Sequence, residues 1–388
     1  MTQRKIDFEA HNAEVEAVWD AYNRREPTRV PVLLVSNPRY TMFNHPSNPR
    51  KIEFDEYDSD PQLMIERQIE HLHWVRHFLP QDAEMGPPKD GWNIYVDMQN
   101  TYDAAWLGGE MKYYQGQVPD VAPWLSDDKK RSLFDTGIPD PFTGGAMAKM
   151  WNFYDYMVAK KDEGWTYKGH PIAAVVPSGM GFDGTLTVAC NIRGTSEFMA
   201  DLIEDPDYAQ ELMGFITEAG ITRLSAYREK LGRLVKQENG SLADDSIQLI
   251  STKMYKEAVM PHHTKLLGAF DNTGPNSIHL CGDSTRHFST IRDELNVMSF
   301  DTGYPVDFKW LRGSVGPDVQ IYGGPSVPFL ECATPDEVTD EVERILCSGI
   351  MEGGRFVLRE GNNLGPGVSL ENAWAMYDAG KKFGVYQN

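Results

Sequence analysis

The chain has 388 residues, of which 41% are hydrophobic and 24% are charged, as in an ordinary soluble globular protein. Its formal net charge of −20 at pH 7 argues against a nucleic-acid partner, because phosphate backbones are bound by clustered Lys and Arg. No apolar run approaches the roughly 18 residues that span a membrane. The polar N-terminus contains no signal-peptide core, so we expect a cytoplasmic protein without a membrane partner.

The first third of the chain predicts few regular elements. Apolar spacing indicates a helix over residues 7–25, and a buried first strand follows at 29–36. A second helix is predicted over 60–77, with Asp60 as its N-cap. Residues 81–141 are rich in Pro, Gly and aromatic residues and lack clear periodicity. We expect them to form a loop-rich aromatic cap over the mouth of the fold.

From Gly144 onwards, predicted strands and helices alternate. The strands cover 171–177, 240–250 (a strand followed by a loop), 276–281, 297–301, 319–322 and 355–359. The helices cover 147–159, 196–203, 206–231, 252–270, 284–294, 306–312, 334–348 and 369–383. Together with the first part of the chain this gives about eight strand–helix units, which predicts a parallel α/β fold of the (β/α)8 TIM-barrel type.

We therefore expect one barrel domain over residues 1–388, with an N-terminal helical extension at 1–28. No GxGxxG motif follows a strand and no P-loop is present, so a nucleotide-binding open sheet is the weaker interpretation. The four cysteines are far apart, and in a reducing compartment they are buried thiols or metal ligands rather than a disulfide framework.

The sequence Ile278-His279-Leu280-Cys281-Gly282 places two soft donors at the end of a predicted strand. His279 and Cys281 are two residues apart, so their side chains project from the same face of the strand. Imidazole and thiolate suit Zn(II), and barrel enzymes carry their chemistry at the carboxyl ends of the strands. The pair could instead be packing residues, because buried Cys and His are common in protein interiors.

Two further residues could complete a metal site in a closed barrel. Glu360 ends the last predicted strand, and Cys332 follows the strand before it. Glu360 could instead be an ion-pair partner of Arg359, and Cys332 could be a small buried residue before the helix that Thr334 caps.

Other side chains are candidates for catalysis or substrate binding. Asp97 lies in the aromatic region and could orient a substrate hydroxyl, and Asp245 follows a strand at the barrel mouth. Either could instead brace a loop or cap a helix. The residues that we expect to contact the substrate are Trp92, Asn100, Tyr102, Tyr304 and Asn362.

The motif His279-Leu-Cys281-Gly282-Asp283 resembles the zinc motif of the cobamide-dependent methyltransferase branch of the uroporphyrinogen decarboxylase superfamily. Segments 254–261, 334–338 and 370–376 are similar to helices of this superfamily, and the resemblance extends over most of the chain. It implies a (β/α)8 barrel, a zinc ion and a partner protein that carries a corrinoid (cobalamin). The arginine-rich N-terminal signature of true uroporphyrinogen decarboxylases is absent, which argues against porphyrinogen decarboxylation.

Thiol-methylating members of the branch carry a third ligand, a Cys in a Gly-Cys turn after the last strand. Here that turn reads Gly361-Asn362-Asn363-Leu364, so Asn362 replaces the Cys and Glu360 is the nearest substitute ligand. The Glu-Gly-Asn-Asn form resembles the branch that demethylates methoxylated aromatic compounds for a corrinoid protein. One thiolate, one imidazole and one carboxylate leave a harder zinc, which suits an ether oxygen.

The resemblance thus implies the methyltransferase component of an O-demethylase. A zinc-dependent enzyme would remove a methyl group from a methoxylated, aromatic substrate and pass it to the Co(I) corrinoid of a partner protein. The alternatives are methyl transfer from a methyl-corrinoid protein to a thiol or tetrahydrofolate acceptor, a cofactor-free decarboxylase, and a binding protein without chemistry. The sequence leaves open the methyl donor, the corrinoid partner and whether the chain forms a homo-oligomer.

Overall fold

The computed structural model describes residues 4–44 and 46–387. Its largest sheet has five parallel strands in the order β10–β9–β8–β7–β6, and a second sheet joins β1 in parallel to β5. These strands are β1 (Trp92–Tyr95), β5 (His170–Val176), β6 (Ser241–Ala243), β7 (Asn276–Leu280), β8 (Val297–Thr302), β9 (Gln320–Gly323) and β10 (Phe356–Leu358). Short antiparallel pairs are β2 (Met111–Lys112) with β3 (Asp120–Val121), and β4 (Thr166–Tyr167) with β5.

The extended segment 29–35 supplies the eighth strand of the ring. Val32 forms a parallel bridge with Leu358 of β10, and the Leu33 amide donates to the Leu358 carbonyl at 2.9 Å. Eight parallel segments that alternate with helices confirm the predicted α/β barrel. In the described part of the chain, no helix combines the length and the apolar character that crossing a bilayer requires.

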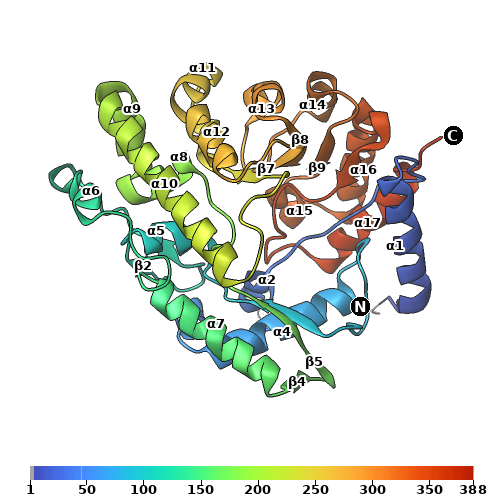
Figure 1. Ribbon diagram of the computed structural model, residues 1–388. Helices are drawn as coiled ribbons and strands as arrows, with labels where there is room; N and C mark the ends of the chain where they lie inside the picture. The colour runs from blue at the N-terminus through green and yellow to red at the C-terminus, as the bar shows by residue number, and fades with distance from the viewer. Residues whose placement is uncertain (1–3, 45, 388) are drawn as a thin grey trace.

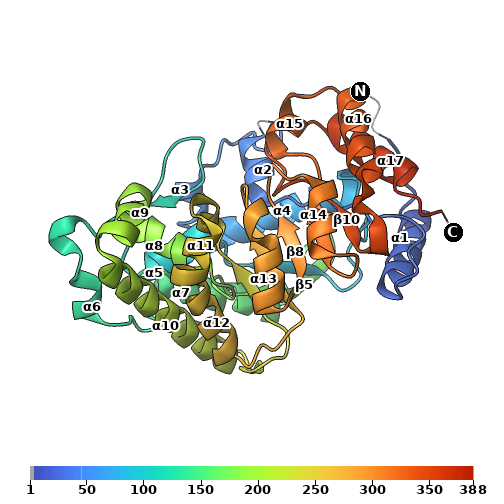
Figure 2. The same ribbon diagram turned by 90° about the horizontal axis from the view of Figure 1, so that it is seen from above.

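Helices cover the outside of these strands, and those from α12 to α17 follow one another around the five-stranded sheet (Figures 1 and 2). The helices are α1 (Phe8–Asn23), α2 (Pro38–Phe43), α3 (Phe54–Tyr57), α4 (Pro61–Phe78), α5 (Tyr102–Trp106), α6 (Ser132–Thr136), α7 (Met147–Asp162), α8 (Thr185–Arg193), α9 (Thr195–Glu204), α10 (Pro206–Lys230), α11 (Thr252–Met254), α12 (Met260–Ala269), α13 (Phe288–Leu295), α14 (Phe308–Val315), α15 (Val327–Cys332), α16 (Pro335–Ile345) and α17 (Leu370–Phe383). A 3-10 helix, η3 (Asp245–Leu249), follows β6, and another, η1 (Gln99–Thr101), precedes α5.

Local capping explains why several predicted helices begin where they do. The Asp60 carboxylate accepts from the Gln62 amide at 2.8 Å and caps α4, as its position before a Pro predicts. At α16, Thr334 and Glu337 form a capping box. The predicted cap at 81–141 is less irregular than expected, because it contains the barrel strand β1 and the short helices α5 and α6.

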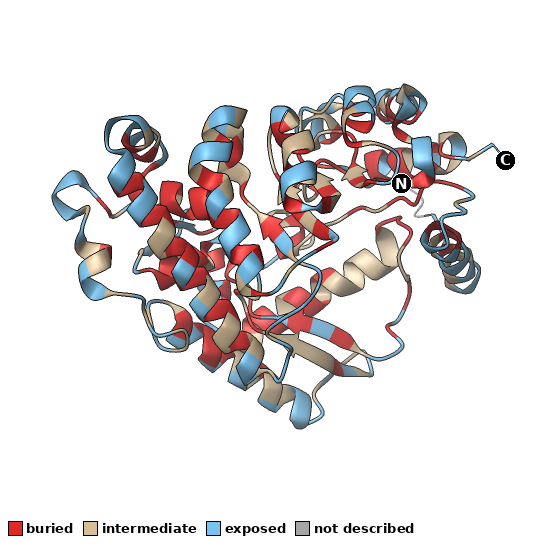
Figure 3. Cartoon of the chain, turned by 45° about the horizontal axis from the view of Figure 1, so that its top comes forward, coloured by how far each residue is buried: buried red, intermediate tan, exposed pale blue. Residues whose placement is uncertain are grey.

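Side chains along the central strands alternate, so that apolar side chains face the surrounding helices and polar side chains face the barrel interior. On β7, Ile278 and Leu280 are buried, and Figure 3 shows buried residues on the inward sides of the surrounding helices. The other face of the same strands carries polar side chains. The strand register aligns His279 with Asp301 of β8, and Asp301 with Tyr322 of β9. The interior of the barrel is therefore a polar layer, in which charged side chains can meet.

A seam separates β5 from β6, since no ladder hydrogen bond joins them in the described ranges. Asp244, at the end of β6, spans this seam. Its buried carboxylate accepts from the amides of Leu186 and Thr187 at the start of α8, both at 2.9 Å. The Thr187 hydroxyl and His263 Nε2 are its other partners, at 2.8 Å and 3.1 Å.

Asp244→Ala is expected to lower the free energy of unfolding by about 3–5 kcal/mol, because it leaves buried donors without an acceptor. Denaturant titration of the purified variant measures this loss. Asp318→Ala is the matched control: Asp318 is an exposed carboxylate paired with Arg25 at 2.8 Å, and its loss should cost under about 1 kcal/mol. Equal effects of the two substitutions would contradict this role for Asp244.

Candidate metal centre

His279 and Cys281 meet at the carboxyl end of β7, as their spacing predicts. His279 Nε2 lies 3.3 Å from Cys281 Sγ. Gly282 follows with a φ of +69°, and a Cβ there would collide with the side chain of Gln248. Glycine therefore permits the sharp turn that ends the strand and leaves both donors at its tip.

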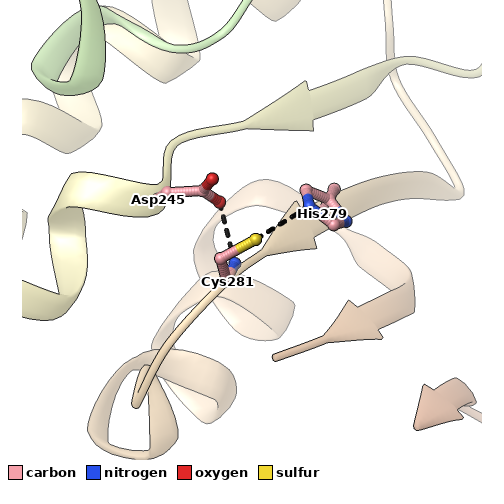
Figure 4. Close-up of side chains that lie close together, drawn as sticks. All are labelled: Asp245, His279 and Cys281. Carbon is pink, nitrogen blue, oxygen red and sulfur yellow. Dashed lines mark hydrogen bonds between the residues drawn. The ribbon is translucent and has the colours of Figure 1, made fainter. Parts of the chain in front are cut away.

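Asp245 is the third member of this group (Figure 4). The parallel register pairs Ala243 of β6 with His279, so two residues further on Asp245 lies beside Cys281. Asp245 Oδ1 accepts a hydrogen bond from the Cys281 amide at 2.8 Å. One donor atom from each of Asp245, His279 and Cys281 lies within 4.8 Å of the other two.

This geometry fits a tetrahedral zinc ion. Bonds of about 2.0–2.3 Å to nitrogen, oxygen and sulfur place neighbouring ligand atoms roughly 3.5 Å apart. The 3.3 Å between His279 Nε2 and Cys281 Sγ is close to that edge. Three protein ligands leave one position for a substrate atom, which is the pattern of catalytic rather than structural zinc sites.

Asp301 orients the imidazole from the next strand. His279 Nδ1 donates to Asp301 Oδ2 at 2.7 Å, and Arg359 Nη1 donates to the same oxygen at 2.9 Å. Burial disfavours the charged imidazole, but Asp301 and Cys281 outweigh it and raise the pKa of His279 to about 10. With Nδ1 committed to Asp301, Nε2 is the nitrogen that faces Cys281 and a metal ion.

Asp301→Ala is expected to weaken metal binding by about 10- to 100-fold, because the imidazole loses its orienting acceptor. Competition with a chromogenic zinc chelator measures the change in affinity. Asp307→Ala is the control, since Asp307 caps the nearby helix α14 without contacting His279. Unchanged zinc affinity in the Asp301 variant would show that Asp301 does not position the ligand.

The turn after β10 adds a contact to the thiol. Asn362 Nδ2 donates to Cys281 Sγ at 3.3 Å, so the residue that replaces the expected Cys still faces the centre. A hydrogen bond to the sulfur disperses the charge of a thiolate. Burial raises the pKa of the Cys281 thiol, while His279 opposes that shift.

Glu360 is placed differently from the prediction that it is a metal ligand. Its fully buried carboxylate accepts from the Val35 amide at 3.2 Å and from Arg359 Nη2 at 3.4 Å. Burial, which Arg359 only partly offsets, raises the pKa of Glu360 to about 8. Arg359 also donates to Asp301, so Glu360 is linked to the metal centre through Arg359 while its carboxylate accepts from the Val35 amide. The third side chain grouped with His279 and Cys281 is Asp245 rather than Glu360.

Cys332, the alternative ligand, ends α15 as an exposed thiol and is not part of the His279 group. Asp97 is buried, and it accepts from the Tyr57 hydroxyl at 3.0 Å and the Gln99 amide at 3.0 Å. These contacts match the alternative role of bracing a loop.

The residues expected to contact substrate fall into three groups. Trp92 is buried at the start of β1, where its indole N–H donates to the Tyr167 carbonyl at 3.3 Å, so it packs in the core at the end of the strand away from the chemistry. Asn100 is exposed in η1. Tyr102, Tyr304 and Asn362 line cavities that border the metal centre.

One of these cavities has a volume of about 400 Å³ and lies over the turn that carries Asn362. Tyr304, Phe43 and Arg39 also line it. Burial lowers the pKa of Arg39, and among the described residues no carboxylate lies within ion-pair distance of its guanidinium. A volume of this size suits a small organic molecule with a single ring.

Sequence reasoning missed Arg39 as a lining residue and Asp301 as the partner of His279. The signal for Asp301 was present, because it ends the strand that follows β7 and faces the same side as His279. Arg39 had no comparable signal, since it lies in the short helix α2, in a stretch for which the sequence predicts no regular element.

The comparisons with known proteins agree with this architecture. Among solved structures, 25 chains match. One, described as a methyltransferase from Methanosarcina mazei, superposes with a TM-score of 0.64 at 18% sequence identity, over 95% of this chain and 98% of that chain. At this identity the similarity shows the fold. A search of curated protein sequences found no match.

A family model described as "Uroporphyrinogen decarboxylase (URO-D)" matches residues 14–383 of this chain. That range includes every barrel strand and all three side chains of the candidate metal centre. The chain therefore belongs to the uroporphyrinogen decarboxylase family.

Proposed function

We propose that this protein is a zinc-dependent methyltransferase that demethylates a methoxylated aromatic compound for the Co(I) corrinoid of a partner protein. The proposal rests on the three grouped donors, which are one thiol, one imidazole and one carboxylate. Asn362, rather than a second Cys, contacts the sulfur of Cys281. The similarity to a solved structure described as a methyltransferase supports the same reaction class.

Asp245, His279 and Cys281 would hold the zinc, with the imidazole oriented by Asp301. Bound there, zinc would polarise an ether oxygen at the open position and stabilise the negative charge that develops when the methyl group leaves. A carboxylate in place of a second thiolate gives up less charge to the metal, and the Asn362 hydrogen bond draws further charge from the sulfur. Both effects would make a bound zinc ion more electrophilic.

The cavity beside Asn362 would take the aromatic ring. Phe43 and Tyr304 line its wall, and its volume of about 400 Å³ accommodates a substituted benzene ring. The guanidinium of Arg39, which forms no ion pair with any described residue, would attract a polar or anionic ring substituent. The side chains of this cavity would thus bind and orient the substrate beside the metal centre.

Two measurements test the proposal. Metal analysis of the purified protein should find one zinc ion per chain. A Co(I) corrinoid protein mixed with the enzyme and 2-methoxyphenol should then change to the methyl-Co(III) absorption spectrum, with release of catechol. A protein without zinc, or a Co(I) spectrum that stays constant with a panel of methoxylated aromatics, would exclude this function. Release of CO₂ from an aromatic acid would favour a decarboxylase instead.

A further inference from the structure

A second group of polar side chains lies across the seam from the metal centre. Tyr102 of α5 and Asp183, in the loop after β5, line a cavity of about 420 Å³, and His279 lines the same cavity. His279 is thus reached from two sides: the cavity of Tyr102 and Asp183 on one, and the Asn362 turn on the other. Neither Asp183 nor Tyr102 belongs to the metal centre, so the function of this pair is still to be explained.

The Asp183 loop is held rigidly. The Tyr102 hydroxyl donates to Asp183 Oδ1 at 2.5 Å, and the Asp183 amide donates to Asp103 Oδ2 at 3.0 Å. The fully buried Arg223 donates to Asp103 Oδ1 at 2.6 Å and to the Gly181 carbonyl at 3.0 Å, and also contacts the Gly179 carbonyl. The position of the Asp183 carboxyl is therefore fixed by a buried network rather than by a mobile loop.

The charges in this network leave Asp183 without a counterion. Arg223 is paired with Asp103, and Tyr102 is neutral at ordinary pH. The negative charge of Asp245 also acts on Asp183. Two carboxyl groups thus share one guanidinium, which favours a proton on the one that is not paired with it. Burial and the charge of Asp103 raise the pKa of Asp183 to about 8, although Tyr102 and Arg223 oppose the shift.

We propose that Asp183, hydrogen-bonded to Tyr102, donates the proton to the substrate oxygen that loses its methyl group. This inference rests on the proposed function. The carbon–oxygen bond breaks and its electron pair stays on oxygen, which takes the proton of the Asp183 carboxyl to become a hydroxyl. The methyl carbon bonds to the Co(I) corrinoid, whose electron pair forms the new bond. The Asp183 carboxylate recovers a proton from water.

The leaving-group dependence of the rate tests this role. Asp183→Asn keeps the shape of the side chain but cannot give up a proton, so demethylation of 2-methoxyphenol should slow on the order of 10²-fold. A methoxyarene with a nitro group para to the ether releases a stable phenolate, and its demethylation should be affected far less. Zinc content should match that of the wild type.

The pH profile supplies a second readout and a second variant. The wild-type rate should fall above about pH 8, where Asp183 loses its proton, and this limb should disappear in Asp183→Asn. Tyr102→Phe removes a hydrogen bond that stabilises the carboxylate, so its alkaline limb should move to higher pH. Asp58→Asn is the matched control, because Asp58 forms a similar pair with the Tyr113 hydroxyl at 3.1 Å outside this cavity.

The outcomes separate the two proposals. A wild-type enzyme that methylates no Co(I) corrinoid rejects the proposed function itself. An active wild type whose Asp183→Asn variant slows equally with both ethers, or not at all, rejects proton donation by Asp183 and leaves the methyltransferase intact.

Discussion

Cys281→Ala is expected to release the zinc and to lower the demethylation rate by roughly 10³-fold or more. Removal of one of three protein ligands leaves only two to hold the metal, and the ether oxygen then loses several kcal/mol of charge stabilisation. His279→Ala should have the same effect, because its Nε2 and the Cys281 sulfur lie at one edge of the same centre, 3.3 Å apart. Zinc analysis after dialysis and the Co(I) absorbance assay measure the two losses.

Cys332→Ala is the matched control for a lost thiol. Cys332 was the alternative ligand on sequence grounds, but it is exposed at the end of α15. Its substitution should leave zinc content and rate unchanged. Glu360→Gln tests which carboxylate is the third ligand. If Glu360 binds the metal, this variant should lose zinc; if Asp245 does, it should retain zinc. Loss of zinc in both of these variants, with none in Asp245→Ala, would contradict the ligand set.

Asn362→Cys is expected to tighten zinc binding while reducing ether demethylation by about 10²- to 10³-fold. Asn362 Nδ2 lies 3.3 Å from Cys281 Sγ, so a thiolate introduced here would sit within reach of the metal. Four protein ligands close a zinc site, and a second thiolate makes the metal less electrophilic. The ether oxygen would then have no position to occupy. Chelator competition and the Co(I) absorbance assay measure the two opposite changes.

Asn362→Ala shows whether the Cys variant acts by filling the open metal position or by distorting the turn after β10. Alanine removes the hydrogen bond to the sulfur without adding a ligand, so the rate should fall by about tenfold and the open position should remain. Similar rates for the Ala and Cys variants would argue that Asn362 acts only through the backbone turn. A Cys variant that demethylates at the wild-type rate would remove the main reason for preferring an ether substrate.

Local signals were sufficient to predict most of the barrel. Helix α4 begins after Asp60 because a carboxylate satisfies its first amides, and α16 begins after Thr334 for the same reason. The strand β7 follows from its apolar alternation, and the same alternation places His279 and Cys281 together. These features depend on neighbours within one turn or one strand, which the sequence displays directly.

Features that depend on contacts distant in sequence could not be predicted in this way. The choice of Asp245 over Glu360 rests on the register between β6 and β7 and on the contacts that hold Glu360 at Val35 and Arg359. Neither is visible in one segment alone. Trp92 was expected to contact substrate because its aromatic-rich surroundings resemble a binding loop, yet it begins a short buried strand. Four residues carry too little periodicity to reveal a strand.

The seam between β5 and β6 separates the proposed metal ligands from the proposed proton donor. Asp245, His279 and Cys281 lie in or directly after strands of the five-stranded sheet, whereas Asp183 and Tyr102 belong to the side of β1 and β5. Asp244 is the buried link between the two sides. Substitutions that widen or narrow the seam would change the distance between the Asp183 carboxyl group and the substrate oxygen, while the affinity for the metal stays constant. Selection could therefore adapt such an enzyme to ethers of different leaving-group strength without rebuilding its metal site.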